Sequence, residues 1–498
     1  MAPSAAHVEQ PGWLRRCLTP SLADVFFLAL FLAVFARQVG LEALLADGDT
    51  GWHIRAGELA LAAGRAPVAD PFSFSLPGQP WFAWEWGSDV LFALAFRWHG
   101  LAAVAALAGV ALALAAAVIF ARILRRGAGL GLALAAALAA ASASSIHYLA
   151  RPHVFSILFY AVALGVIEAD SRQPGWRVWA LVPLAALWAN LHGGFVILPA
   201  TLALAAACGP ARQRVRYGLL AAATAAATLL NPYGWRLHEH IFRYLNSSWI
   251  LDHVREFQSP SIRAEGTVVF ALLLLAAVAV AGRAGRLEAA LVLIWGFAAL
   301  RSARHVPFFA MVGAPVVASA AAAWWRGLAD RAAAQSPLRI LWELSRDLGR
   351  RPGFSAWLPA AAAAIILLAA SAPAGFPAAC FPVRAVEGNA PLLAAGAEMP
   401  RVLTSDQWAD YLIFRLYPRA KVFFDGRSDF YGPTLGADYR KLMGAEAGWR
   451  ELLDRYGFSL ALLPHDWALS TVLDREPGWR LVYRDPVAVL YARQGSRP

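Results

Sequence analysis

Apolar residues fall into long runs along the chain, separated by short polar connections. A helix needs about 20 apolar residues to cross the hydrocarbon core of a bilayer. Eleven runs approach or reach this length, and they lie at 21–40, 101–121, 128–147, 153–168, 177–190, 194–209, 217–231, 267–282, 287–301, 305–325 and 354–372. The pattern therefore predicts an α-helical polytopic membrane protein with about eleven transmembrane helices.

A different pattern begins near residue 373, where apolar and polar residues are mixed as in a soluble domain. Short stretches rich in branched and aromatic residues predict strands at 401–405, 421–427, 459–464, 479–485 and 487–493. Segments 406–417 and 436–456 are typical of helices, the second ending at Gly457, and Asp485-Pro486 predicts a hairpin turn. We therefore expect a transmembrane domain at 1–372, with a long first loop at 41–100, and a small α/β domain at 373–498.

Composition agrees with a membrane protein and narrows the partners. The 498 residues are 59% hydrophobic and only 15% charged, whereas about a quarter of a soluble domain is charged. The net charge of +11 does not predict a nucleic-acid partner, because the basic residues lie in loops between apolar runs. The scattered cysteines Cys17, Cys208 and Cys380 predict neither a disulfide framework nor a metal cluster.

The arginines between the runs predict the direction of the chain in the membrane. Arg15 and Arg16 precede the first run, which lacks a small-x-small cleavage site and is expected to remain as an anchor. With a cytoplasmic N-terminus, the inner loops hold 18 arginines and the four outer connections far fewer. We therefore expect a multi-pass protein of the inner (plasma) membrane whose C-terminal domain is periplasmic or extracytoplasmic. Merging 177–190 with 194–209 would turn the later basic loops outward, so the two runs are kept separate.

Polar and titratable residues gather where this direction places the outer ends of the runs. The set comprises Asp47, Asp49, His53, Glu85, Asp89, Arg151, His153, His192, Asn231, Arg301, Arg304 and His305. Ionisable groups at the hydrocarbon edge are costly unless they are paired, hydrated or used. Three of the arginines also run against the charge rule, which indicates a site that binds an anion.

The carboxylates of the first loop have two interpretations. Asp49 and His53 are four residues apart at the start of a predicted helix over 50–63, so they share one helix face. A carboxylate there can accept a proton from a hydroxyl or hold a divalent cation. Alternatively, Asp49 is only an N-cap and Asp47 a turn residue. Glu85 and Asp89 either complete an acidic cluster or are first-turn acids favoured by the helix dipole.

Other candidates also have a purely structural alternative. His153, His192 and His305 lie at the ends of apolar runs. Each is either a contact for a phosphate or a metal ion, or an ordinary residue of the membrane interface. Asp425 and Arg427 either contribute to a binding site or form a salt-bridged turn at a strand end.

The arrangement resembles the GT-C superfamily of membrane glycosyltransferases. Its acidic motif directly follows the first membrane helix, a long outer loop comes next, and a C-terminal domain follows ten or more spans. The stretch 47–92, which begins DGDTGWHIRAGELALAAGR, is similar to the first loop of a group of bacterial GT-C-like proteins. RPH (151–153), NLHGGF (190–195), NPYGW (231–235) and DGRSDFYG (425–432) resemble further motifs of that group. No Trp-Trp-Asp-Tyr-Gly motif is present, and the acids of the first loop are not adjacent as in O-mannosyltransferases. The acceptor class, whether glycan, lipid or protein, therefore stays open.

The resemblance implies a polyprenyl-phosphate-linked sugar as donor, an acceptor on the outer face, and inversion at the anomeric carbon. The catalytic aspartate of the family falls on Asp47 or Asp49, of which Asp49 is preferred for its pairing with His53. The donor phosphate is then expected at Arg151, His153, Arg301, Arg304 and His305. The acceptor or other contacts are expected at Glu85, Asp89, His192, Asn231, Asp425 and Arg427.

No cofactor is required in this scheme, since arginines can supply the positive charge. A magnesium or manganese ion held by Asp47, Asp49 and Glu85 is the alternative. Three other functions compete: a transporter or flippase of lipid-linked glycans, a surface-polysaccharide polymerase or ligase, and a non-catalytic membrane scaffold. A transporter needs polar groups near the middle of the bilayer, whereas the middles of these runs are Ala, Leu and Val.

Overall fold

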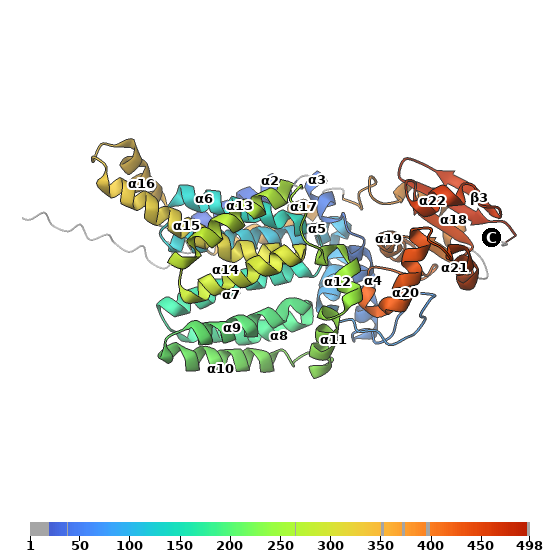
Figure 1. Cartoon of the computed structure of the whole chain (residues 1–498), viewed down its shortest axis with the longest axis horizontal. Helices are drawn as coiled ribbons and strands as arrows, with labels where there is room; N and C mark the ends of the chain where they lie inside the picture. Colours follow the sequence, from blue (N-terminus) through green and yellow to red (C-terminus); the bar gives the residue numbers. More distant parts are fainter. Residues whose placement is uncertain are drawn as a thin grey trace, which may run out of the picture.

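A bundle of helices with a small α/β domain at one end makes up the molecule (Figure 1). The computed structural model describes residues 19–36, 38–263, 265–349, 353–370, 374–394 and 399–495. Arg15, Arg16 and Cys17, invoked above for the first run and the cysteine pattern, lie outside the described residues, as do Arg350 and Arg351.

Every apolar run of the sequence contains a helix. The helices of the bundle and first loop are α2 (Leu22–Val34), α3 (Gln38–Leu44), α4 (Asp49–Ala63), α5 (Trp86–Arg125), α6 (Leu130–Ser144), α7 (His153–Arg172), α8 (Leu181–Leu191), α9 (Ile197–Cys208), α10 (Ala211–Ala227), α11 (Trp235–Leu245), α12 (Ser248–His253), α13 (Glu265–Val280), α14 (Arg286–Arg301), α15 (Val306–Arg331), α16 (Pro337–Leu348) and α17 (Trp357–Ala370). Short 3₁₀ turns connect them, among them η1 (Ser145–His147), η2 (Trp176–Ala180), η3 (Gly193–Val196), η4 (Arg255–Phe257), η5 (Ala281–Arg283) and η6 (Ala303–His305). The chain is a mostly helical, multi-pass membrane protein.

The number of membrane crossings is not the same as the number of apolar helices. Among the described residues, five helices are long and apolar enough to cross a bilayer, and α2 with α3 makes a sixth if this pair, bent by 90°, is one span. Helices α8 and α9 have 11 and 12 residues, so each is about 17 Å long at 1.5 Å per residue. Both helices pack against α10 and against the 3₁₀ turn η3 that connects them. Each is too short to cross a bilayer by itself. The count of eleven spans therefore stays a prediction.

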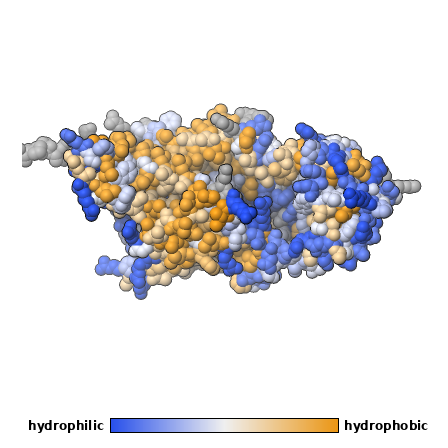
Figure 2. All heavy atoms as spheres, turned by 45° about the horizontal axis from the view of Figure 1, so that its top comes forward, coloured by the Kyte–Doolittle hydropathy of each residue, from blue (hydrophilic) through white to orange (hydrophobic). Residues whose placement is uncertain are grey.

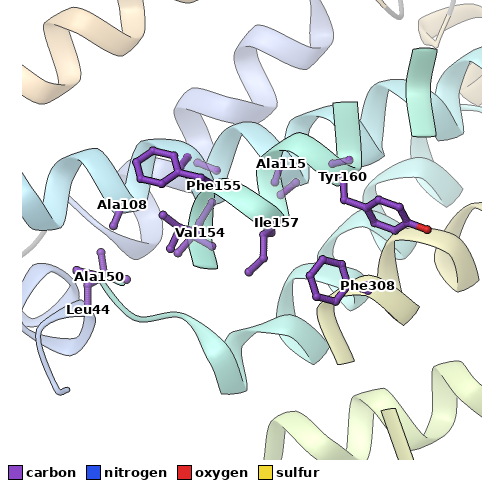
Figure 3. Close-up of a cluster of buried hydrophobic side chains, with 14 of the residues drawn as sticks. Leu44, Ala108, Ala115, Ala150, Val154, Phe155, Ile157, Tyr160 and Phe308 are labelled. Atoms are coloured by element: carbon purple, nitrogen blue, oxygen red, sulfur yellow. The ribbon is translucent and has the colours of Figure 1, made fainter. Parts of the chain in front are cut away.

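Helix α5 lies at the centre of the bundle and packs on α2, α4, α6, α7 and α17. Its buried face is largely alanine, including Ala108 and Ala115, and small side chains let neighbouring helices approach closely. Val154 and Phe155 of α7 fill the space against this face (Figure 3). The second run was expected to begin at 101, but α5 already begins at Trp86 and is interrupted at His99 and Gly100. On the face shown in Figure 2, apolar side chains cover the helical bundle, while the C-terminal domain is mostly hydrophilic.

The C-terminal domain is a four-stranded sheet with helices. Its strands β1 (Val402–Thr404), β2 (Leu460–Pro464), β3 (Trp479–Arg484) and β4 (Ala488–Arg493) lie in the order β1-β2-β4-β3, with β1 parallel to β2 and the other pairs antiparallel. Its helices are α18 (Val383–Ala394), α19 (Asp406–Leu416), α20 (Ser428–Met443), α21 (Trp449–Tyr456) and α22 (Ala468–Leu473). The hairpin turn at Asp485 is confirmed, and its Oδ1 accepts from the amides of Val487 and Ala488.

Two predicted elements of this domain are wrong. The segment 421–427 is not a strand, because Val422 exchanges backbone hydrogen bonds with Phe72 and Phe74 of the first loop and makes only single bridges. The predicted helix 436–456 is two helices, α20 and α21, separated where Ala445 and Gly448 have positive φ.

The C-terminal domain packs directly on the first loop, through α19 on α4. The Gly48 amide donates to Gln407 Oε1 at 2.7 Å, and Arg55 Nε donates to the Phe414 carbonyl at 2.9 Å. A Cβ at Gly48 would lie 2.2 Å from the Gln407 carbonyl oxygen, so only glycine permits this approach. The two parts of the chain share one continuous core.

Candidate functional site

The start of α4 is fixed against the turn between α6 and α7. Thr50 Oγ1 donates to the Ala150 carbonyl, and the Ala150 amide donates to the Leu44 carbonyl. Asp47 Oδ1 accepts from the Asp49 amide, which orients the first turn of the helix. These bonds place the two aspartates beside the next residue of the turn, Arg151.

Arg151 joins three carboxylates. Its guanidinium lies 2.7 Å from Asp49 Oδ2, 3.3 Å from Asp47 Oδ2 and 3.6 Å from Glu256 Oε2. A planar fork with several donors suits such a position better than an ammonium group. The network continues to Arg304, which lies 3.8 Å from Glu256.

Arg304 is held by aromatic side chains as well as by charge. Its guanidinium lies over the ring of Phe257 at 4.4 Å from the centroid, and Nη1 lies 3.4 Å from the Tyr244 hydroxyl. The structure thus brings two guanidinium groups, from turns far apart in the sequence, to the same acidic cluster. We call Asp47, Asp49, Arg151, Glu256 and Arg304 the charged cluster.

A second group of titratable side chains lies beside the charged cluster. His53 Nδ1 lies 2.6 Å from Asp89 Oδ1, and its Nε2 lies 3.7 Å from Glu85. Glu85 is also 3.4 Å from His192 Nε2, and His192 Nδ1 hydrogen-bonds Ser156 Oγ at 2.7 Å. His53 therefore faces Asp89 and Glu85, whereas the sequence interpretation had paired it with Asp49.

Burial controls the charge of these groups. Burial raises the pKa of Asp47 to about 7, although Arg151 opposes the shift, and raises the pKa of Glu85 to about 8. Burial also lowers the pKa of His53 well below its ordinary value, so its imidazole is neutral. For Glu256, burial is outweighed by Arg304 and Arg151, and the pKa is lowered to about 2. Glu256 is therefore the fixed anion between the two arginines.

Asp410 brings a carboxyl group from the C-terminal domain to Asp49. A Cβ at Gly426 would lie 2.1 Å from Asp49 Oδ1 and 2.8 Å from Asp410 Oδ2, so the two oxygens meet over this glycine. Both are buried acceptors for which the described residues provide no conventional donor. Burial and the charge of Asp49 raise the pKa of Asp410 well above its ordinary value. Burial also raises the pKa of Asp49, although Arg151 opposes the shift, and Asp49 lies between Asp410 and Arg151.

Several candidates from the sequence lie in other contacts. Asn231 bonds within its own turn, to the Thr228 and Gly234 carbonyls. His153 contacts the His147 carbonyl and His305 the Ala298 carbonyl. Arg301 is exposed and forms no recorded ion pair with any residue that the structure describes.

Asp425 and Arg427 form a buried ion-pair network with the first loop. Arg427 Nη2 lies 2.6 Å from Asp425 Oδ2 and 2.8 Å from Asp70 Oδ1, with all three side chains at most 1% exposed. The guanidinium also lies over Trp81 and Phe72. This arrangement corresponds to the salt-bridged turn, the alternative to a sugar contact.

The three acids considered as metal ligands do not converge. Across the described residues, no three His, Cys, Asp or Glu side chains form a group that could hold a metal ion. Asp47 and Asp49 both contact Arg151, whereas Glu85 lies between His53 and His192.

Sequence reasoning missed Asp410, Glu256 and Tyr244. Asp410 lies in an ordinary amphipathic helix, and nothing local distinguishes it from a surface acid. Glu256 carried a usable signal, because it lies in a predicted outer connection that also contains arginines.

Comparison with known proteins identifies the fold. No model of a known protein family matches the sequence, and no curated protein matches it. The archaeal oligosaccharyltransferase AglB from Archaeoglobus fulgidus, in complex with an inhibitory peptide and a dolichol-phosphate, is similar with a TM-score of 0.57 and 13% identity over 96% of this chain and 74% of that chain. ArnT from Cupriavidus metallidurans bound to undecaprenyl phosphate matches with a TM-score of 0.44 and 16% identity over 95% of this chain and 98% of that chain. The chain therefore shares the fold of that oligosaccharyltransferase, in agreement with the resemblance noted from the sequence.

Proposed function

We propose that this protein is a membrane glycosyltransferase that moves a sugar from a polyprenyl-phosphate-linked donor to an acceptor hydroxyl. The observation that carries the proposal is the charged cluster, in which the Asp49 carboxylate lies 2.7 Å from Arg151 and Glu256 connects Arg151 to Arg304. A proton acceptor beside guanidinium groups is what this transfer needs. The fold shared with an oligosaccharyltransferase supports it.

The reaction is a single displacement. The acceptor oxygen attacks the anomeric carbon, the bond from that carbon to the phosphate oxygen breaks, and Asp49 takes the hydroxyl proton. The configuration at the anomeric carbon inverts. The phosphate leaves with its bonding electron pair and gains negative charge, which Arg151 and Arg304 stabilise. Glu256 keeps both guanidinium groups in place before the donor binds.

The direct test is Asp49→Asn in the purified full chain, reconstituted in liposomes with a panel of undecaprenyl-phosphate-linked sugars. A general base contributes about 10²–10⁴-fold to the rate, so transfer should fall by that factor, and size-exclusion chromatography checks that the variant is folded. Asp438→Asn, on α20 and away from the cluster, is the matched control and should keep full activity. Undiminished transfer by Asp49→Asn would remove Asp49 from the mechanism, and no transfer from any donor by the unaltered chain would contradict the function.

We also infer that the reaction needs no divalent cation, because Arg151 already lies against Asp47 and Asp49 and, with Arg304, can supply positive charge to the leaving phosphate. Transfer should persist after treatment with EDTA. Loss of transfer that magnesium or manganese restores would show that the cation is required.

The proposed orientation has the N-terminus in the cytoplasm of the cell and the C-terminal domain outside the inner (plasma) membrane. Cys380 is exposed in that domain, and Cys208 ends α9 near a loop expected inside. A membrane-impermeant maleimide should label Cys380 in intact spheroplasts and leave Cys208 unlabelled until the cells are lysed. Cys380→Ser provides the control. Labelling of Cys208 alone would reverse the topology.

A further inference from the structure

A basic cavity lies between the C-terminal end of α5, the last turns of α7, and α16. It has a volume of about 470 Å³ and contains four arginines, Arg122, Arg125, Arg172 and Arg346, against one acid, Glu168. Helix α16 is at the end of the molecule opposite to the C-terminal domain (Figure 1). The cavity is therefore separate from the charged cluster.

The single acid of the cavity is already used. Glu168 lies 3.2 Å from Arg122, 2.7 Å from Arg126 and 2.7 Å from Arg172. Arg126 has a second partner, Glu288, outside the cavity lining. The positive charge of the lining thus exceeds what its own carboxylate can balance.

Arg125 and Arg346 contribute the accessible part of this charge. Both side chains are exposed at the rim. Arg125 forms no recorded ion pair within the described part of the chain, and Arg346 has only a 3.8 Å contact with its neighbour Asp347. An exposed guanidinium group without a close carboxylate can donate two parallel hydrogen bonds to the oxygens of a phosphate.

An apolar surface adjoins the basic lining. Helix α16 exposes Ile340, Leu341, Leu344 and Leu348 along one face, while Arg339, Glu343 and Arg346 lie along the other. Trp342 anchors the helix by packing on Trp325. An amphipathic helix of this kind lies in the membrane interface with its apolar face among the acyl chains. The cavity opens beside the end of that helix, where Arg346 and Gly349 line it.

We propose that this cavity binds the phosphate headgroup of an anionic phospholipid, whose acyl chains lie along the apolar face of α16. The excess of guanidinium groups selects the anionic headgroup, and the adjoining leucines select an amphiphile over a soluble phosphate compound. Basic pockets between membrane helices are suited to such headgroups. The site is independent of the transfer reaction and has no residue in common with the charged cluster.

The test compares lipid binding by native mass spectrometry of the full chain, titrated with phosphatidylglycerol or phosphatidylcholine. The unaltered protein should retain phosphatidylglycerol in preference to phosphatidylcholine. Arg125→Glu/Arg346→Glu should lower the affinity for phosphatidylglycerol about tenfold or more, since each basic residue near a lipid headgroup contributes about 1 kcal/mol. The milder Arg125→Gln/Arg346→Gln should give a smaller loss in the same direction.

The control is Arg212→Glu/Arg331→Glu, which makes the same change of charge at exposed arginines outside the cavity lining. It should bind phosphatidylglycerol like the unaltered chain. An equal loss in the control would show a general effect of surface charge and overturn the proposal. Unchanged binding by the cavity variants would overturn it too, as would displacement of the bound lipid by millimolar inorganic phosphate, which would assign the cavity to a soluble ligand.

Discussion

Arg151 shows how one side chain can organise an acidic site. It faces Asp47, Asp49 and Glu256 from one turn. Removing one partner of a buried ion pair is strongly destabilising, because the other charge is left uncompensated. The same residue therefore keeps the carboxylates close together at rest and offers donors to a phosphate during the proposed reaction.

At this scale the pH dependence of stability can be predicted for Glu85. Its pKa is about 8 in the folded chain, against an ordinary value of 4.5, chiefly because burial disfavours the charged form. Between those values the folded state keeps a proton that the unfolded state has lost, so stability falls as the pH rises. Glu85→Gln should flatten this decline and make the protein more stable than the unaltered chain above pH 8, by up to about 5 kcal/mol.

Thermal unfolding between pH 5 and pH 9 measures this effect. Glu451→Gln, at an exposed position of α21, should leave the pH profile unchanged. A decline in Glu85→Gln as steep as in the unaltered chain would assign the pH dependence to other groups.

Among the secondary-structure elements, the close packing of α4 on α5 depends on one glycine, Gly57. A Cβ at Gly57 would lie 1.9 Å from the Asp89 carbonyl oxygen, in the backbone of the neighbouring helix. Gly57→Ala must therefore push α4 away from α5 and disturb the contact between His53 and Asp89. We expect a loss of about 1–3 kcal/mol or more in the free energy of unfolding.

The matched control is Gly218→Ala in α10, where a Cβ meets nothing within 4 Å. Alanine is the better helix former by up to about 1 kcal/mol, so this variant should be at least as stable as the unaltered chain. Denaturant unfolding in detergent compares the two. Equal stability of both variants would contradict the close packing of α4 on α5.

Elements were predictable from sequence where local pattern decides them. Each apolar run contains a helix, whereas α11, α12 and α16 lie outside the runs. The strands β1 to β4 followed from branched and aromatic residues. Segment 421–427 failed because its hydrogen bonds go to the first loop, a contact that no local pattern reveals. The start of α5 failed for another reason: its first turns carry polar residues and lie before the apolar run.

At the scale of the whole molecule, Arg427 ties the C-terminal domain to the first loop. Its buried guanidinium lies between Asp70 and Asp425 and packs against aromatic rings. Arg427→Met should leave two buried carboxylates without their cation and cost about 3–5 kcal/mol. Because the two parts share one core, we expect the loss to appear in a single unfolding transition.

Arg450→Met serves as the comparison, since Arg450 forms an exposed salt bridge with Glu476. Such pairs contribute about 0–1 kcal/mol, so its transition should barely move. Calorimetry of the full chain distinguishes the two results. A transition of the C-terminal domain alone in Arg427→Met would contradict the shared core.

The site itself was only partly predictable. Asp49 and Arg151 could be selected from the sequence, because charged residues at the ends of apolar runs are conspicuous. Asp410 could not, since its proximity to Asp49 depends on the packing of α19 on α4, which is set by the tertiary fold. His53 was assigned the wrong partner because helix spacing shows which residues share a face, and not what the neighbouring helix places opposite.

The contact between Asp49 and Asp410 has a consequence for biosynthesis. Asp49 leaves the ribosome soon after the first membrane segment, whereas Asp410 is translated only after the last one. A nascent chain that is still being inserted therefore lacks half of this carboxyl pair and the domain that encloses it. The proposed base acquires its final surroundings only when synthesis is almost complete, so under the proposed function a half-made chain has no complete transfer site.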